Sequence, residues 1–369
     1  MHNTIIYILL IVISACISII SKFSLGIKVL LFFITYYILF FILEFLSIYS
    51  EIHIWEQREN TSQCYDWFEH YFKKNYGILN GENIFDYSES IYFGDYTISS
   101  KKALENKYNL IFNELNLSKG KKLLDCGCGI GAWMKYCKER GVDVIGLTLS
   151  KEQQLLLKKK GLTAYVQDYR VFNKNFINQF DAISLLGSTE HVTDYSGEKD
   201  MNKKSYNDYK NLFSVMKKYL KPNGRMLLTV LTQCKPQHER LDPYNLFQSY
   251  IMQRHYGGYY AKTEIISKAI TDNGFTINSI DDYTKDYHWI SIAEPDHFGH
   301  WWIHWEEDPL DKIIYFFKGL VTDPFLLHHW LYYGMDTWMW QFGGYQKTPL
   351  TDNQVKKAIA NLKYFIISN

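Results

Sequence analysis

The 369-residue sequence has almost no excess charge of either sign, because 40 Lys and Arg residues offset 39 Asp and Glu residues to a formal net charge of +1. Proteins that bind nucleic acid through its phosphates generally carry a basic patch or a strongly basic balance. We therefore expect no nucleic-acid partner. The length exceeds one minimal domain and is enough for about two.

Cysteine is also scarce. The six cysteines show no disulfide-framework spacing for so long a chain, which suits a reducing compartment. Cys126 and Cys128 flank a glycine as a metal-binding pair might, but no second pair follows, so small buried residues are the favoured interpretation. Five histidines in the Trp-rich runs of the C-terminal third have no accompanying acidic pattern, and we predict no metal site among them. These are His297, His300, His304, His328 and His329.

Two long apolar runs lie near the N-terminus, Thr4–Ile20 and Val29–Tyr49, with Glu44 near the end of the second. Each is about long enough to span a bilayer, so residues 1–50 are predicted to form two membrane-spanning or hairpin helices. A secretory signal is disfavoured because a basic n-region is missing and a second run follows. A pair of buried core helices is disfavoured because neither run has a polar face.

The motif richest in information is Leu-Leu-Asp-Cys-Gly-Cys-Gly-Ile-Gly at residues 123–131, followed at once by a helical pattern. A strand, a glycine turn and a helix open a doubly wound nucleotide-binding sheet, whose ligand lies at the carboxyl end of the strand. Glycines allow the tight turn and a close approach of the ligand. Dinucleotide folds use G-x-G-x-x-G, whereas this spacing is G-x-G-x-G after an Asp. The predicted cofactor-binding residues are Asp125, Gly127, Gly129 and Gly131.

Apolar runs alternate with helical patterns along the next part of the chain, which is typical of a parallel α/β sheet. The predicted strands after the first are Val142–Leu147, Thr163–Val166, Asp181–Leu186 and Arg225–Leu231. The predicted helices are Ser99–Leu115, one capped by Ser150, Ser205–Leu220 and Thr263–Asn273.

The ends of these strands carry the other candidate residues. No acid follows the second strand, where most nucleotide-binding sheets hold the ribose, so Thr148, Ser150 and Gln153 are predicted to do so. Asp168 follows the third strand and is placed to accept from an adenine amino group, with a helix cap as the alternative. Glu190 and His191 follow the fourth strand, and we expect one of their two side chains to face the site.

These motifs together resemble the cyclopropane-fatty-acid synthase family of S-adenosylmethionine-dependent methyltransferases. That family includes the mycolic acid cyclopropane synthases and the fungal sphingolipid C9-methyltransferases. The Thr-Leu-Ser run at 148–150 is the most specific feature, and it adds Leu149 to the cofactor-binding residues, as Gln-Asp-Tyr-Arg at 167–170 adds Tyr169. The resemblance covers roughly residues 60–345, and its other parts are Phe180-Asp181, Glu190-His191-Val192, Gly257-Gly258, Asn273-Gly274-Phe275, Asp282-Tyr283 to Trp289, and 336–342.

The resemblance implies a Rossmann-like class I methyltransferase fold with a mostly parallel seven-stranded sheet and helical lid insertions. It implies S-adenosylmethionine as cofactor and methyl transfer to a carbon–carbon double bond of a lipid acyl chain. The implied domains are an aromatic collar and cofactor lid (51–100), a methyltransferase domain (101–345) with an acyl-binding insertion at about 240–335, and a C-terminal tail (346–369). Within 51–100, Glu51–Tyr76 is the collar and Ile84–Tyr96 the lid.

In the family, a bound bicarbonate removes the proton that closes the cyclopropane ring, held by a Glu, a Tyr, a Cys and a His. Glu190 matches the Glu, and Tyr283 matches the Tyr with a shift of one residue. The Cys belongs to a Tyr-Ser-Cys motif of the family, and this chain has Tyr-Ser-Glu-Ser at residues 87–90 instead. The position of the His is taken by Thr229. Bicarbonate therefore stays open, as does the choice between a cyclopropane and a methyl branch. His191 and His238 are spare candidate bases, with a structural role as the alternative.

The resemblance implies an unsaturated membrane lipid as substrate and the bilayer as partner. Lys22 and Lys28 favour a cytoplasmic loop between the apolar runs, which would place the catalytic domain on the opposite side of the membrane. S-adenosylmethionine, however, is made in the cytosol, which favours a cytosolic catalytic domain. A shallow hairpin satisfies both, and the catalytic domain is expected on the cytosolic face. The alternatives are an N-methyltransferase for a small amine and a non-catalytic lipid-binding protein.

Aromatic residues make up 17% of the chain, and the Trp residues crowd into the C-terminal third, notably at His297–Trp305 and Leu326–Trp340. They could line an acyl channel, form a belt at the membrane interface, or be ordinary core. A general compositional bias is the remaining interpretation.

Overall fold

The computed structural model describes residues 2–21, 23–49, 61–62, 65, 88–194, 200–234, 258–293, 348–358 and 360–369. Several predictions lie outside the described residues. These are the role of His238, most of the collar, the insertion at about 240–335 up to residue 257 and after residue 293, the five C-terminal histidines, and the resemblance over 336–342.

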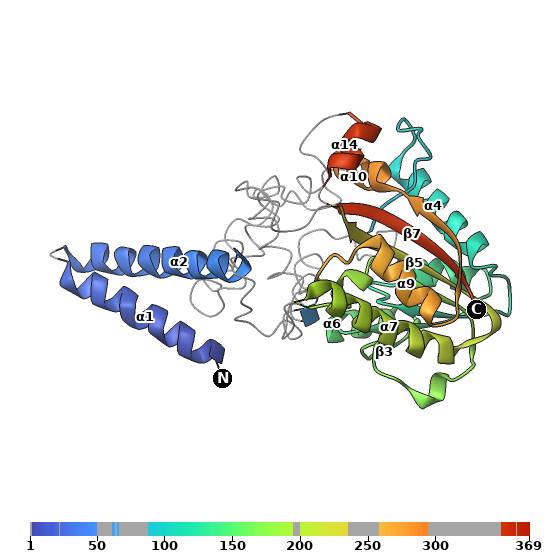
Figure 1. Cartoon of the computed structure of the whole chain (residues 1–369), viewed down its shortest axis with the longest axis horizontal. Helices are drawn as coiled ribbons and strands as arrows, with labels where there is room; N and C mark the ends of the chain where they lie inside the picture. Colours follow the sequence, from blue (N-terminus) through green and yellow to red (C-terminus); the bar gives the residue numbers. More distant parts are fainter. Residues whose placement is uncertain are drawn as a thin grey trace.

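A seven-stranded sheet forms the centre of the described chain, in the order β3-β2-β1-β4-β5-β7-β6 (Figure 1). The run β3-β2-β1-β4-β5 is parallel throughout, and β7 is antiparallel to both β5 and β6. The order reverses at β1, so the carboxyl ends of β1 and β4 flank a crevice that can take a ligand. The predicted mostly parallel α/β sheet is confirmed. The strands are β1 (Lys122–Cys126), β2 (Asp143–Thr148), β3 (Thr163–Val166), β4 (Phe180–Leu186), β5 (Leu220–Gln233), β6 (Thr276–Asp282) and β7 (Ala360–Ser368).

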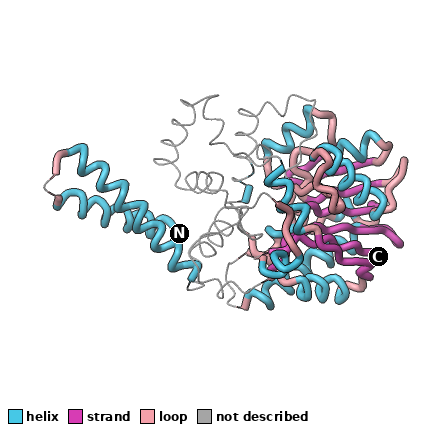
Figure 2. The backbone as a smooth tube through the Cα atoms, turned by 90° about the horizontal axis from the view of Figure 1, so that it is seen from above, coloured by secondary structure: helices cyan, strands magenta, loops and turns pink. Residues whose placement is uncertain are grey.

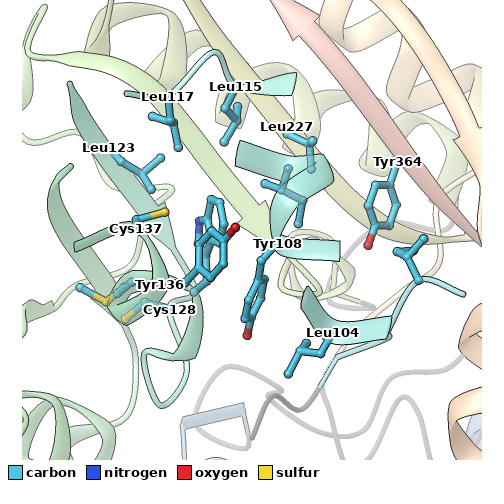
Figure 3. Close-up of a cluster of buried hydrophobic side chains, with 14 of the residues drawn as sticks. Leu104, Tyr108, Leu115, Leu117, Leu123, Cys128, Tyr136, Cys137, Leu227 and Tyr364 are labelled. Carbon is cyan, nitrogen blue, oxygen red and sulfur yellow. The ribbon is translucent and has the colours of Figure 1, made fainter. Parts of the chain in front are cut away.

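Helices cover both faces of the sheet (Figures 1 and 2), and each face has its own apolar core. Successive strand residues point to opposite faces. Thus Tyr364 of β7 packs in the core beneath α4 and α5, and Phe365 packs in the core beneath α7 and α9. Figure 3 shows part of the first core, with Tyr364 reaching from β7 toward the side that carries Leu104 and Tyr108. The helices are α4 (Ser100–Glu114), α5 (Ala132–Glu139), α6 (Lys151–Lys159), α7 (Met201–Tyr219), α9 (Thr263–Asp272), α10 (Thr284–Ala293) and α14 (Asp352–Lys357), with 3-10 turns η1 (Lys174–Phe176) and η2 (Thr189–His191).

Two helices begin after the polar cap residues that the sequence predicts. The Ser99 side chain accepts from the Lys102 N–H, and the Ser150 side chain accepts from the Gln153 N–H. The third strand has its predicted bounds. β5 begins at Leu220, earlier than expected, because Leu220 pairs with Phe180 before an irregularity with Asn223 at φ 62°, after which pairing resumes at Arg225.

The assignment of residues 346–369 to a tail outside the domain is wrong. Residues 360–368 form β7, which pairs with β5 on one side and β6 on the other. Its apolar residues are almost wholly buried, so the strand is part of the core. The methyltransferase domain therefore does not end at residue 345.

The two N-terminal apolar runs form α1 (His2–Ile20) and α2 (Leu25–Tyr49), which lie side by side as a hairpin (Figures 1 and 2). Among the residues that the structure describes, no helix is both long and apolar enough to cross a membrane. The predicted pair of membrane-spanning segments is therefore unsupported, although both runs are helical.

Candidate active site

The glycine turn after β1 has the backbone shape that its sequence predicts. Gly127, Gly129 and Gly131 all have positive φ, at 80°, 50° and 82°. The N–H groups of Gly127 and Cys128 both donate to the Leu147 carbonyl of β2, at 2.9 Å each. This places the turn over the carboxyl ends of β1 and β2, where a nucleotide-like ligand binds in such sheets.

Gly127 also brings the turn against the end of β4. A Cβ added at Gly127 would lie 2.4 Å from the Ser188 Cβ, and Ser188 Oγ donates to the Cys126 carbonyl at 2.9 Å. Only glycine allows this approach at φ 80°. The turn and the segment that carries Glu190 therefore form one cradle.

Asp125 is buried at the end of β1, where its Oδ1 accepts from Ser184 Oγ of β4 at 2.8 Å. Ser184 in turn accepts from the Trp133 indole N–H at 3.1 Å. This predicted cofactor residue thus also holds β1, β4 and α5 together.

The residues predicted to bind ribose are gathered after β2, but they already bond to one another. Thr148 Oγ1 donates to Gln153 Oε1 at 2.6 Å and accepts from the Ser150 N–H at 3.1 Å. Ser150 caps α6, and the Leu149 carbonyl accepts from Ser62 Oγ at 3.1 Å. The network fixes the shape of this loop, and whether these groups also bind ribose stays a prediction.

Asp168 has a partner that the sequence did not reveal. Its two oxygens accept from Arg170 Nε and Nη2, the shortest contact being 2.7 Å, and Oδ1 also accepts the Arg170 backbone N–H. The alternative of a helix cap is therefore replaced by a local turn. The neighbouring Tyr169 hydroxyl donates to the Ser188 carbonyl at 2.7 Å. Contact of Asp168 with adenine stays a prediction.

Arg170 links this loop to the segment that carries Glu190, because its Nη1 donates to the carbonyls of His191 and Val192, at 3.1 Å each. We expect Arg170→Lys to lower methyl transfer by about tenfold, since an ammonium cannot reproduce the planar set of contacts. The measurement is labelled-methyl incorporation beside S-adenosylhomocysteine affinity. Arg140→Lys is the control, because Arg140 stacks on Tyr136 away from this loop; equal losses in both variants would contradict the prediction.

Glu190 lies in η2, directly after β4, and is only 7% exposed. Its Oε1 accepts from the Leu231 N–H of β5 at 2.7 Å, and its Oε2 has no partner among the described residues. Burial, and secondarily the charge of nearby Glu89, raise the pKa of Glu190 to about 7. Such a carboxyl at a strand end is suited to chemistry near neutral pH.

His191 contacts a different part of the chain from Glu190. Its Nε2 lies 2.9 Å from the Tyr65 hydroxyl, and the two rings meet edge to face. The adjacent side chains thus diverge as expected, and a catalytic role for His191 stays a prediction. The Glu190 carbonyl accepts from the Tyr259 N–H at 3.0 Å, and a Cβ at Gly258 would lie 2.4 Å from that carbonyl oxygen. This contact explains why a glycine stands at 258.

The described part of the predicted lid lies over the end of β4. A Cβ at Gly187 would have the Ser88 Cβ 3.8 Å away. Asp286 of α10 fastens the segment, because its carboxyl accepts from the backbone N–H groups of Tyr92 and Phe93 and from the Tyr96 hydroxyl. Burial raises the pKa of Asp286 to about 6.

A buried charged cluster joins this lid segment to α4 and β7. Lys107 Nζ is 3.7 Å from Glu89 Oε1, and the two side chains are 0% and 1% exposed. Glu89 also accepts from the Tyr364 hydroxyl, and Lys107 donates to Ser88 Oγ. The Tyr283 ring lies 4.6 Å from the Tyr364 ring, centroid to centroid, and burial raises the pKa of Tyr283 to about 12. Tyr283 and Glu190, both predicted from the sequence, thus border the same cluster.

The cluster does not fit a bicarbonate ion. Two of the four expected contacts are replaced. Glu89 stands where a Cys was expected, and Thr229 stands where a His was expected. The Thr229 hydroxyl oxygen already accepts from the Gly187 N–H at 2.8 Å. Lys107 already pairs with the Glu89 carboxyl, whose charge also acts on Glu190. A further anion would meet like charge in a buried, low-dielectric site.

Sequence reasoning missed Lys107 and Tyr364, and noted Glu89 only as a departure. Lys107 carried a usable signal, because it falls on the buried stripe of α4 with Ala103, Leu104 and Ile111. A lysine in an apolar stripe implies a buried partner. Tyr364 had no such signal, since it lay in the supposed tail.

Comparison with known proteins identifies the family of the chain. The family model described as mycolic acid cyclopropane synthetase matches residues 54–300, more than half of the chain. A probable fatty acid methyltransferase of Mycobacterium tuberculosis is 38% identical over 143 residues, covering 37% of this chain and 30% of that protein. The cyclopropane-fatty-acyl-phospholipid synthase of Escherichia coli K12 is 35% identical over 133 residues, covering 35% of this chain and 31% of that protein. The matched region therefore spans about a third of the length of these relatives.

Among solved structures, the mycolic acid cyclopropane synthase CmaA1 complexed with SAH and CTAB aligns with a TM-score of 0.59 at 21% identity. The alignment covers 84% of this chain and 98% of that one, and at this identity it supports the fold alone. The glycine turn, the buried carboxyl after β4 and the matched family model lead to one conclusion: the chain belongs to the mycolic acid cyclopropane synthetase family.

Proposed function

We propose that this protein transfers a methyl group from S-adenosylmethionine to a carbon–carbon double bond in a lipid acyl chain. The observation that carries the proposal is the cradle at the carboxyl ends of β1 and β4, where Gly127 packs on Ser188 and Glu190 follows as a buried carboxyl. The named activities of the relatives, a fatty acid methyltransferase and an acyl-phospholipid cyclopropane synthase, agree with it.

The residues present fit S-adenosylmethionine. The glycine cradle stands at the carboxyl ends of β1 and β4, where such sheets bind a nucleotide, and the loops after β2 and β3 follow the neighbouring strands for the ribose and adenine. The structural neighbour CmaA1 was solved in complex with SAH, the demethylated product of this cofactor. When bound, the cofactor supplies a methyl group on a positively charged sulfur.

An alkene is a poor nucleophile, so this chain must align the double bond and exclude water. The lid segment fastened by Asp286 serves the exclusion. Positive charge that develops on the acyl chain is stabilised by aromatic faces and by the Glu190 carboxylate. Tyr283 and Tyr364 supply rings beside the charged cluster, and Tyr96 and Trp289 supply a second pair with centroids 5.2 Å apart.

The proposal is tested by lipid mass spectrometry on cells fed methyl-labelled methionine, with and without the expressed chain. Labelled acyl chains are the expected result, and fragmentation separates a cyclopropane from a methyl branch. Label confined to head groups or soluble amines would replace the acyl assignment with N-methylation. Absence of any label together with absence of cofactor binding would reject an enzymatic function.

The hairpin of α1 and α2 is proposed to attach the enzyme to a bilayer surface, with the catalytic domain on the cytosolic face, where the cofactor is made. Most of the large apolar side chains that are exposed among the described residues belong to this hairpin, including Ile19 at 72% and Ile20 at 80%. Monomeric soluble proteins rarely expose so large a contiguous apolar surface. Surface insertion would bury it without a complete span.

We expect the double variant Val12→Lys with Val29→Lys to lower binding of the purified protein to phosphatidylglycerol vesicles by about tenfold or more, because each charge opposes insertion. Cosedimentation measures it. The control is Val171→Lys with Ile177→Lys, since these side chains are similarly exposed but lie in the sheet domain. Equal loss in both pairs would count against attachment through the hairpin.

A further inference from the structure

Glu89 is a buried carboxyl group that has no role in the steps proposed above for cofactor binding and cation stabilisation. We propose that Glu89 is the proton acceptor of the methyl-transfer reaction, a carboxylate built into the chain in place of a bound bicarbonate. This inference rests on the proposed function and deepens it at the same site.

The position of Glu89 supports the assignment. Ser88, its neighbour, lies against Gly187 at the carboxyl end of β4, the edge of the sheet where the cradle is. The Glu89 charge acts on Glu190, two residues beyond Ser188 of that cradle. Glu89 therefore lies at the catalytic edge of the sheet rather than deep in either core.

The partners of Glu89 come from two distant elements. Lys107 of α4 lies 3.7 Å from Glu89 Oε1, and Tyr364 of β7 donates its hydroxyl to the same oxygen. An ammonium group and a hydroxyl donor are suited to hold a carboxyl group in a fixed place. The two contacts converge on Oε1 and so fix the position of the carboxyl group between α4 and β7.

A purely structural ion pair explains this arrangement less well. A buried pair seldom stabilises a fold more than apolar residues of the same size would. Here a second carboxyl, Glu190, adds like charge beside the pair. Two buried polar atoms also lack partners among the described residues, Glu190 Oε2 and the Oγ of Ser90, which follows Glu89 directly. Unsatisfied groups and like charge together are typical of a reactive site.

The chemistry balances with the groups present. A carbon of the double bond forms a bond to the methyl carbon as the sulfur–methyl bond breaks, and the sulfur leaves as a neutral thioether. The acyl chain then carries a positive charge and loses one proton. Loss from the added methyl closes a cyclopropane ring, and loss from a neighbouring carbon leaves a methyl-branched alkene. In either case the Glu89 carboxylate takes the proton, becomes a carboxylic acid and later releases the proton to water, while Lys107 stays charged.

The test compares variants in cells fed methyl-labelled methionine, with purified protein titrated with S-adenosylhomocysteine in parallel. We expect Glu89→Gln to lower labelled acyl chains by about 10²-fold or more, with S-adenosylhomocysteine affinity changed by no more than about threefold. Glu89→Asp keeps the charge and should retain measurable labelling. Glu105→Gln, an exposed carboxylate on α4, is the control. Labelling by Glu89→Gln at the level of the unmodified chain would overturn the proposal.

Glu89→Gln removes the carboxylate that faces the buried Lys107, a change that can destabilise the fold by itself. The double variant Glu89→Gln with Lys107→Met removes both charges and keeps the volume. Inactive protein that still binds S-adenosylhomocysteine supports the proposal, whereas restored labelling would show that Glu89 serves only as the counter-ion of Lys107. Failure of the unmodified chain to label any acyl chain would instead reject the proposed function itself.

Discussion

Replacing Glu190 with Gln is expected to lower methyl transfer by about 10²- to 10³-fold, because the variant cannot offer a negative charge to the cation that forms in a desolvated site. In the unmodified protein, activity should rise with pH through about 7, as the carboxyl whose pKa burial raises to that value ionises. The variant should lack this limb. Activity of purified protein measured across pH checks both statements, and an unchanged rate would remove Glu190 from the mechanism.

Glu190→Gln is expected to make the folded protein less sensitive to a rise in pH, even though it lowers activity. The folded-state pKa of Glu190 lies above its usual value of 4.5, so its contribution to stability is present in full below that value and is lost as pH rises through about 7. Between pH 5 and 8 the unmodified protein should therefore lose up to about 3 kcal/mol more unfolding free energy than Glu190→Gln does. Thermal or urea unfolding at both pH values measures this difference.

Asp181→Asn is the matched control for Glu190→Gln. Asp181 stands at the amino end of β4, and ion pairs with Lys121 and Lys221 together with the Lys122 N–H lower its pKa despite partial burial. Losing this carboxylate should reduce stability above its normal pKa and leave methyl transfer nearly unchanged. Activity loss of similar size in both variants would mean that the Glu190 effect is structural.

Gly127→Ala is expected to abolish measurable cofactor binding and to cost about 2–5 kcal/mol of unfolding free energy. Alanine at φ 80° is strained by about 1–2 kcal/mol, and the overlap 2.4 Å from the Ser188 Cβ adds an overpacking cost of about 1–3 kcal/mol. Ser188 cannot move aside easily because its hydroxyl is bonded to the Cys126 carbonyl. Calorimetric titration with S-adenosylhomocysteine and urea unfolding measure the two effects.

Two further variants separate strain from overlap. Gly161 has φ 68° with no heavy atom within 4 Å of an added Cβ, so Gly161→Ala should cost only about 1–2 kcal/mol and leave binding intact. Adding Ser188→Gly to Gly127→Ala should recover the overlap part of the loss. If the double variant is as impaired as Gly127→Ala alone, the close approach to Ser188 is not the cause.

Local sequence signals predicted most of the sheet because each depends on a few adjacent residues. The glycine turn needs positive φ at three positions, and the caps at Ser99 and Ser150 need one side chain each. Strand β3 was predicted to the residue. Glu190 was found for the same reason, since it directly follows a strand whose apolar pattern is unambiguous.

The part of the site that depends on distant pairing could not be predicted in this way. Tyr364 meets Glu89 only because β7 inserts between β5 and β6, and no local pattern in residues 360–368 states which strands flank it. The sequence places Asp168 for adenine or for a helix cap, but it does not reveal the pairing with Arg170, which arises from loop geometry. The same holds for the contact of Arg170 with the His191 carbonyl. The membrane-spanning prediction rested on hydropathy alone.

The insertion of β7 has a consequence for the order of events during synthesis on the ribosome. β6 emerges from the exit tunnel roughly 80 residues before β7, its only partner strand among the described residues. Until residue 368 is out, β5 presents an open apolar edge, and nascent chains with such edges are targets for chaperones. Glu89 and Lys107 are made early but wait for Tyr364, so a ribosome that stalls upstream of β7 would release a product with an unfinished sheet and an unfinished charged cluster.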